Sequence, residues 1–165
     1  MKNIFRLALL AAVAAFGFWL CTILFPSPEK VIRSRLADLA RTATFGAQDS
    51  AIARALKAQR LANFFSADAQ LTFDTPGMGQ HTLSGREEIR ENATAAFQSI
   101  PTLRVEFLDA NIRLDAGRHD AEVGLTAKVT FGDTKDFGVQ EMRFLFRKID
   151  GQWLIVRIET VQTLS

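Results

Sequence analysis

The chain has 165 residues, about one domain in length, and its Lys and Arg exceed its Asp and Glu by two. That excess lies in the first 25 residues, which hold Lys2, Arg6 and 20 apolar residues, so the remaining body is formally neutral. A neutral body excludes a basic nucleic-acid surface despite the pI near 9.0. Cys21 is the only cysteine and Tyr is absent, which excludes disulfides, Cys-ligated zinc, and thiol or phenol catalysis from the body.

The N-terminal head is long enough to cross a membrane. Leu7 to Phe25 is an uncharged run of 19 residues, extended by Ile4 and Phe5. At ~1.5 Å per helical residue, this run approaches the ~30 Å hydrocarbon core of a bilayer. We therefore expect residues 4–25 to be a single-pass membrane anchor inside an N-terminal segment 1–27, followed by one folded domain over residues 28–165.

Two other interpretations of the head remain open. A cleaved signal peptide would use Ala12-Val13-Ala14, but the apolar core before that site would be only the five residues 7–11. A lipoprotein would need a small residue before Cys21, where Leu20 stands.

The orientation of the anchor has two readings. The count of Lys and Arg near the span, two before and four after, favours a cytoplasmic body. However, the later four lie in a predicted helix, and large domains translocate largely regardless of charge. We expect the body to be extracytoplasmic, which means periplasmic in a bacterium.

The first half of the body is mainly helical. Pro28 suits a first turn, and Glu29 to Phe45 follows as an amphipathic helix that ends at Gly46. Asp49 or Ser50 can cap a second helix over 51–65 whose apolar residues are Ile52, Leu56 and Phe64. Short strands over 68–74 and 80–83 flank a Thr75-Pro76-Gly77 turn. Ser84 and Glu87 then form a predicted capping box for a helix to about Ser99.

The second half alternates with a period of two, which is typical of strands. The predicted strands cover 103–114, 121–131, 137–149 and 153–162, with a shift of phase that indicates a bulge near Leu108-Asp109. Asp150-Gly151 predicts a two-residue hairpin turn between the last two strands. The fold class is therefore α+β, with four long antiparallel strands after the helices.

Three phrases carry a resemblance to a known family. They are Leu61-Ala-Asn-Phe-Phe-Ser-Ala-Asp-Ala69, Leu83-Ser-Gly-Arg-Glu-Glu-Ile89 and Lys148-Ile-Asp-Gly-Gln-Trp153. With their spacing, residues 29–164 resemble the nuclear transport factor 2 (NTF2)-like, or SnoaL-like, family. The resemblance implies a cone in which a curved sheet wraps around about three helices. The family includes isomerases, dehydratases and hydrolases beside members that only bind or assemble, so the fold does not decide the function.

The hairpin register predicts a candidate pocket. With Asp150-Gly151 as the turn, Phe146 pairs with Ile155 and Phe144 with Arg157. This register places Arg157 and Glu159 on the aromatic face that should wrap the helices, where charge requires a partner. The pocket candidates are Asp74, Gln140, Arg157, Glu159, Phe144 and Trp153. The alternatives are a structural ion pair at the open end of the sheet, or a register off by one that leaves both charges in solvent.

Acid–base chemistry has one further candidate pair. Asp74 and His81 flank a turn that lies near the cavity mouth in the resembling enzymes, and a carboxylate with an imidazole can serve as base and partner. A turn residue and a solvated strand residue are the plainer interpretations. In the alignment on Asp68, the catalytic aspartate of ketosteroid-isomerase-like members falls on Phe73. No phosphate-binding glycine loop or metal-ligand spacing occurs, so we expect no metal and no cofactor.

Two classes of function remain from the sequence. The first is a membrane-anchored NTF2-like domain that binds a ligand or assembles without catalysis, such as the single-span assembly subunits of type IV secretion machines, which it resembles in architecture. The second is a SnoaL-like enzyme that acts on a small apolar substrate in the cone. We also expect a homodimer through the sheet, because Leu145, Leu154, Val156 and Ile158 populate the face opposite the aromatic one.

Overall fold

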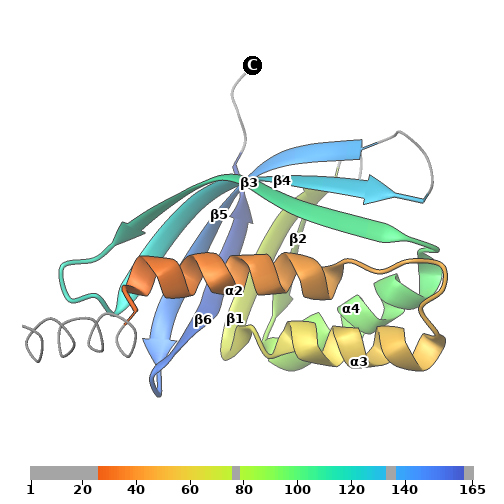
Figure 1. The fold of residues 1–165 in the computed structure, drawn as a ribbon, viewed down its shortest axis with the longest axis horizontal. Helices are drawn as coiled ribbons and strands as arrows, with labels where there is room; N and C mark the ends of the chain where they lie inside the picture. Colours follow the sequence, from red (N-terminus) through yellow and green to blue (C-terminus); the bar gives the residue numbers. More distant parts are fainter. Residues whose placement is uncertain (1–25, 76–78, 133–136, 162–165) are drawn as a thin grey trace, which may run out of the picture.

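The computed structural model describes residues 26–75, 79–132 and 137–161. Three helices and six strands occur within these residues (Figure 1). In chain order they are α2 (Pro28–Ala43), α3 (Ala51–Ala62), β1 (Phe65–Thr75), β2 (Gly79–Ser84), α4 (Arg86–Ser99), β3 (Leu103–Leu114), β4 (Asp120–Phe131), β5 (Phe137–Ile149) and β6 (Gln152–Thr160). The predicted order of elements is confirmed, and the α+β fold class with it.

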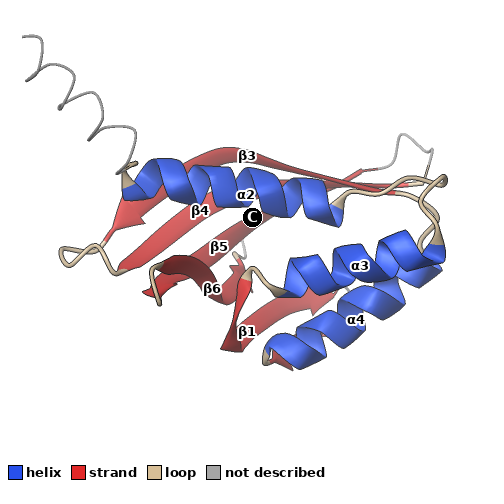
Figure 2. Cartoon of the chain, turned by 60° about the horizontal axis from the view of Figure 1, so that its bottom comes forward, coloured by secondary structure: helices blue, strands red, loops and turns tan. Residues whose placement is uncertain are grey.

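One curved sheet forms a layer, and the helices cover one of its faces (Figure 2). The strand order is β2-β1-β6-β5-β4-β3, in which β1 and β6 are parallel and the other neighbours are antiparallel. We call the helix-covered face the inner face and the opposite one the outer face. The chain thus folds as the predicted cone of sheet and helices.

Helix α2 runs antiparallel to β3, and its predicted apolar stripe is buried. Arg33 donates to the carbonyl of Ala110 at 3.2 Å, whereas Phe45, just after the helix, pairs with Leu103 at the start of β3. The buried stripe is Ile32, Leu36, Leu39 and Ala43.

The predicted apolar face of α3 is wrong. Ile52 and Leu56 are 75% and 53% exposed, while Ala58 and Ala62 are buried. The reason is close packing against α4, in which small side chains let the helices approach and Ala58 meets Phe97. Helix α3 also ends at Ala62 rather than Phe65, because Phe65 is the first residue of β1. Its N-cap is Ser50, whose Oγ accepts from the backbone of Ala53.

The start of α4 also differs from the prediction. Gly85 takes the N-cap position with φ of 89°, a conformation that favours glycine, and the backbone N–H of Ser84 donates to Glu88 Oε2 at 2.7 Å. The expected capping box with Glu87 is therefore wrong, since Glu87 pairs instead with Arg90.

The strand irregularities decide which side chains face the helices. In β3 the register shifts between Leu108 and Asn111 around Asp109, whose φ is 54°, so the predicted bulge is confirmed. The Asp150-Gly151 turn is confirmed as well, with φ of 49° and 80°. A second shift was not predicted: Phe146 pairs with Ile155, but Leu145 pairs with Arg157. This bulge in β6 inverts the faces of every residue after Val156.

The core lies between the helices and the inner face. It joins α2 and α4 to β1, β4, β5 and β6, with Phe144, Phe146 and Ile155 at most 2% exposed. A smaller cluster of Phe45, Ala58 and Phe97 closes the far end of the helical layer.

Two predictions fall on residues that the structure does not describe. The membrane anchor at 4–25 and the Pro76-Gly77 part of the predicted Thr75-Pro76-Gly77 turn lie outside the described residues. Within the described ranges, no helix combines the length and the hydropathy that a membrane crossing requires.

Candidate binding surface

The inner face is filled by apolar side chains. Phe144 and Trp153 point inward as predicted and are 2% and 3% exposed. The Phe144 ring meets Phe107 edge-on at 5.6 Å between centroids. Ser66 is the one buried polar residue among those the structure describes, and its hydroxyl donates to Asp68. The described interior therefore presents aromatic and aliphatic surface rather than acid–base groups.

Arg157 and Glu159 do not point into this interior. The bulge in β6 pairs them with Leu145 and Arg143, which puts both on the outer face, and the predicted inward orientation is wrong. Their side chains are 48% and 37% exposed and lie 3.5 Å apart. Arg157 also donates to Gln70 Oε1 at 3.4 Å. The pair is an exposed contact within β6, linked to β1 through Gln70 and separated from Phe144 and Trp153 by the sheet itself.

The other pocket candidates are dispersed. Gln140 lies near the start of β5, where it is exposed and its amide donates to the carbonyls of Val161 and Glu141. Asp74 pairs with Gln80 in the backbone register, and its side chain is outside the described residues. His81 is exposed and stacks on Phe73 with 5.9 Å between the rings.

Arg35 on α2 is a side chain that the sequence reasoning missed. Its guanidinium lies 5.0 Å from the ring of Phe64, and its Nε is buried without a hydrogen-bond partner among the described residues. Burial lowers the pKa of Arg35, and the nearby carboxylate of Asp38 opposes that shift. No sequence pattern marks it, because Phe64 lies on another element.

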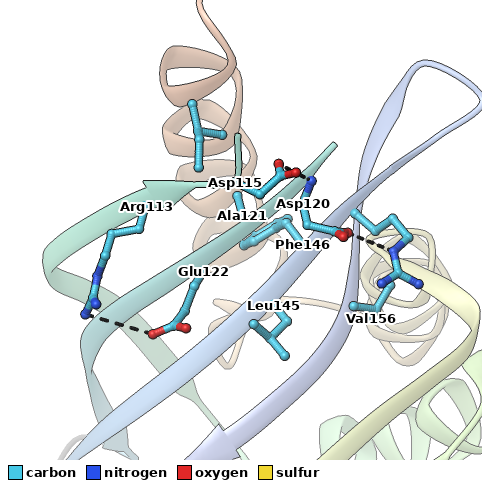
Figure 3. A pocket seen from close by; sticks show the side chains of 10 residues that line it. Arg113, Asp115, Asp120, Ala121, Glu122, Leu145, Phe146 and Val156 are labelled. Atoms are coloured by element: carbon cyan, nitrogen blue, oxygen red, sulfur yellow. Dashed lines mark hydrogen bonds and ion pairs between the residues drawn. The ribbon is translucent and has the colours of Figure 1, made fainter. Parts of the chain in front are cut away.

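A groove of about 380 Å³ opens on the outer face, over β3 to β6 (Figure 3). Leu145 and Val156 form its apolar floor, and charged side chains surround them. Glu122 forms ion pairs with Arg113 at 3.9 Å and with Arg143 at 3.6 Å. A groove with an apolar floor and an ionic rim resembles a protein interface more than a catalytic centre.

The carboxylates near the groove are engaged within the fold. Asp120 binds Arg147 at 2.7 Å, and this hydrogen bond and charge raise the pKa of Arg147. Asp115 accepts from the backbone of Asp120, and also from those of Gly117 and His119, which lowers its pKa. These carboxylates shape the turn between β3 and β4, and neither is available as a general base.

Three further apolar side chains are exposed on the outer face. Phe137 and Val139 of β5 and Leu108 of β3 are 58%, 54% and 44% exposed. The sequence reasoning missed them, although 137 and 139 alternate with the inward positions of the same strand. Two residues predicted for this surface are not available, because Ile158 faces inward and Leu154 is 8% exposed.

The described residues bring no three His, Cys, Asp or Glu side chains together as a metal site would need. No protein-family model and no curated protein matches the chain.

Solved structures do match the fold. An NTF2-like protein with a cystatin-like fold from Novosphingobium aromaticivorans aligns over 92% of this chain and 88% of its own, with a TM-score of 0.63 and 20% identity. The yeast UBP3-associated protein BRE5 aligns over 84% and 100%, with a TM-score of 0.63 and 12% identity. A putative scytalone dehydratase from N. aromaticivorans aligns over 81% and 84%, with a TM-score of 0.58 and 15% identity. The chain therefore has the NTF2-like, cystatin-like cone fold.

Proposed function

We propose that this protein is a membrane-anchored NTF2-like domain with a non-catalytic role in assembly, and that its body is extracytoplasmic. The observation that carries the proposal is the interior: its described part is packed with apolar side chains, and the polar exceptions among the described residues are the buried Ser66 and the partly buried Arg35. Catalysis in a cone needs polar groups positioned on the inner face. The two charged candidates, Arg157 and Glu159, lie on the opposite face.

The outer face is the proposed assembly surface. Phe137, Val139 and Leu108 expose apolar area that a partner would cover, and Leu145 and Val156 add a second apolar area on the same face as the floor of the groove. We propose that a second copy of the chain covers this face. Arginines and glutamates alternate around it, so two copies can pair unlike charges while they bury the apolar positions. Similarity to a yeast protein described as UBP3-associated supports a role in association.

Sedimentation of residues 28–165 tests this proposal. Val139→Glu places a charge on an exposed apolar position of the proposed interface, and we expect it to convert a concentration-dependent dimer to a monomer. Ile52→Glu is the matched control, because Ile52 is equally apolar and 75% exposed but lies on α3. A body that stays monomeric at high concentration, or an equal effect of both substitutions, would contradict the proposal.

The alternative is a SnoaL-like enzyme that acts on a small apolar substrate in the cone. It is favoured by the structural similarity to a putative scytalone dehydratase and by Arg35, whose buried Nε could donate to a polar group of such a ligand. Asp74 would then be the remaining candidate for a base.

Residues 28–165 contain one tryptophan, Trp153, in the core, so its fluorescence reports on the interior. Titration with a small aromatic hydrocarbon should leave that fluorescence unchanged if the interior is closed. A saturable change that Arg35→Met abolishes would favour the enzyme or a ligand-binding domain.

A further inference from the structure

The turns at one end of the sheet lie beside the start of α2. Because α2 runs antiparallel to β3, its first turn lies next to the residues where β3 ends (Figure 1). The 115–119 turn follows β3, and the backbone N–H of Lys148 donates to the carbonyl of His119 at 2.8 Å. That hydrogen bond brings the 150–151 turn to the same end. We call the first turn of α2 and these two turns the turn end.

The proposed anchor stands almost directly before the turn end. Only Pro26 and Ser27 separate residue 25 from Pro28, the first residue of α2. Two extended residues span at most about 7 Å. The opposite end, with the 44–50 loop, is farther away by the length of α2, about 24 Å for its 16 residues. If residues 4–25 are held in a membrane, the turn end is therefore the part of the folded domain that lies nearest to that membrane.

The turn end carries exposed cations from three different elements. Lys30 lies in the first turn of α2, Arg118 in the 115–119 turn and Lys148 near the end of β5, and all three are exposed. Among the nearby acids, Asp115 accepts hydrogen bonds from backbone N–H groups, and Asp120 forms an ion pair with Arg147. Over residues 26–33, 113–120 and 147–151, six Lys and Arg face four Asp and Glu. Cations beside a bilayer are attracted to anionic headgroups.

We propose that the turn end rests on the bilayer, with Lys30, Arg118 and Lys148 against the phosphates of anionic phospholipids. This inference rests on the proposed anchor and adds an orientation to it. The same placement directs two exposed residues away from the membrane: Ile52, at the start of α3 after the 44–50 loop, and Phe137, which pairs with Thr130 near the end of β4. It holds for either topology of the anchor, because the two-residue link is the same on both sides.

Quenching by labelled lipid tests this orientation on the full chain. With Cys21→Ser as background, Ala116→Cys puts a fluorophore on the 115–119 turn, and Ala47→Cys puts one on the 44–50 loop at the opposite end. Both alanines are exposed. In phosphatidylglycerol vesicles with a headgroup-attached quencher, we expect at least threefold stronger quenching at position 116 than at 47. Equal quenching, or stronger quenching at 47, would overturn the orientation.

Charge reversal tests the role of the cations. Arg118→Glu should lower the quenching at position 116 at least twofold in phosphatidylglycerol vesicles, whereas Arg104→Glu, at the opposite end, should not change it. No effect of Arg118→Glu would overturn the proposed headgroup contact. Flotation of the same samples separates this inference from the anchor: a chain that does not float with vesicles contradicts the anchor, whereas a chain that floats with uniform quenching contradicts the orientation alone.

Discussion

Arg54 on α3 joins three segments through one guanidinium. It donates to five backbone carbonyls, and its guanidinium carbon lies 4.8 Å from the ring of Phe45. Three acceptors belong to the end of α4 and the residues after it, and two belong to the loop before α3: Phe97 at 3.0 Å, Ile100 at 2.7 Å, Pro101 at 2.7 Å, Gly46 at 3.2 Å and Asp49 at 3.2 Å. Carbonyls at a helix end lack partners in the helix, so Arg54 satisfies groups that would otherwise need water.

The expected cost of Arg54→Met follows from these contacts. The three shorter hydrogen bonds contribute about 1 kcal/mol each after exchange with water, and the cation–π contact about 0.5–1 kcal/mol. The two hydrogen bonds at 3.2 Å are longer and add little. Removal of the exposed part of the guanidinium brings no gain in stability that would offset these losses. We expect a loss of about 3.5–4 kcal/mol in the free energy of unfolding, or roughly 10–15 °C in Tm for a domain of this size.

Urea unfolding of residues 28–165, followed by circular dichroism, measures this loss. Arg54→Lys keeps the charge but has a single nitrogen, so it should recover only part of the stability. Arg60→Met is the matched control on the exposed side of the same helix and should stay within about 0.5 kcal/mol of the wild type. If Arg54→Met also stayed within that range, the reasoning about these carbonyls would be wrong.

Two further predictions concern the outer face and the turn end. Arg157→Met should change the free energy of unfolding by only about 0–1 kcal/mol, because the pair with Glu159 is exposed; a loss of about 3–5 kcal/mol in urea unfolding would mean an inward, dry pair and contradict the bulge in β6. The pKa of Asp115 is lowered in the fold by the backbone N–H of Asp120, so its stabilising effect is present above the unfolded pKa of about 4 and is lost as the pH falls through the folded value. The stability difference between wild type and Asp115→Asn should therefore shrink as the pH drops below about 4, and a difference independent of pH would refute this.

Local patterns in the sequence were sufficient for the elements of the fold. Pro28 marked the start of α2, Asp150-Gly151 marked a turn, and the change of phase near Asp109 marked a bulge. Each of these signals depends on neighbours in the chain. The face of α3 was not predictable in this way, because it depends on how closely α4 approaches, and the exposed Ile52 and Leu56 imitate a buried stripe. Three of the five acceptors of Arg54 were not predictable either, because they lie more than 40 residues away in the chain.

The bulge in β6 explains why the predicted site was wrong. Residues 153–156 are apolar in both phases of the strand, so alternation cannot show where the register shifts. In the structure the shift coincides with another in β1, where Phe65 pairs with Ile155 but the next pair is Gln70 with Arg157. Two strands far apart in the chain thus share one irregularity, which no local pattern records.

Energetic reasoning on β6 alone would have favoured this bulge. Without it, Arg157 and Glu159 enter an apolar interior while Ile158 is left on the outer face, and isolated charge is costly there. One extra residue after Ile155 reverses the faces of the residues that follow. Ile158 is therefore buried at 4% exposure, and both charges reach solvent. The same bulge removes charge from the inner face and adds it to the outer one. A single local irregularity therefore keeps the inner face a packed core and places the charged side chains of β6 on the outer face.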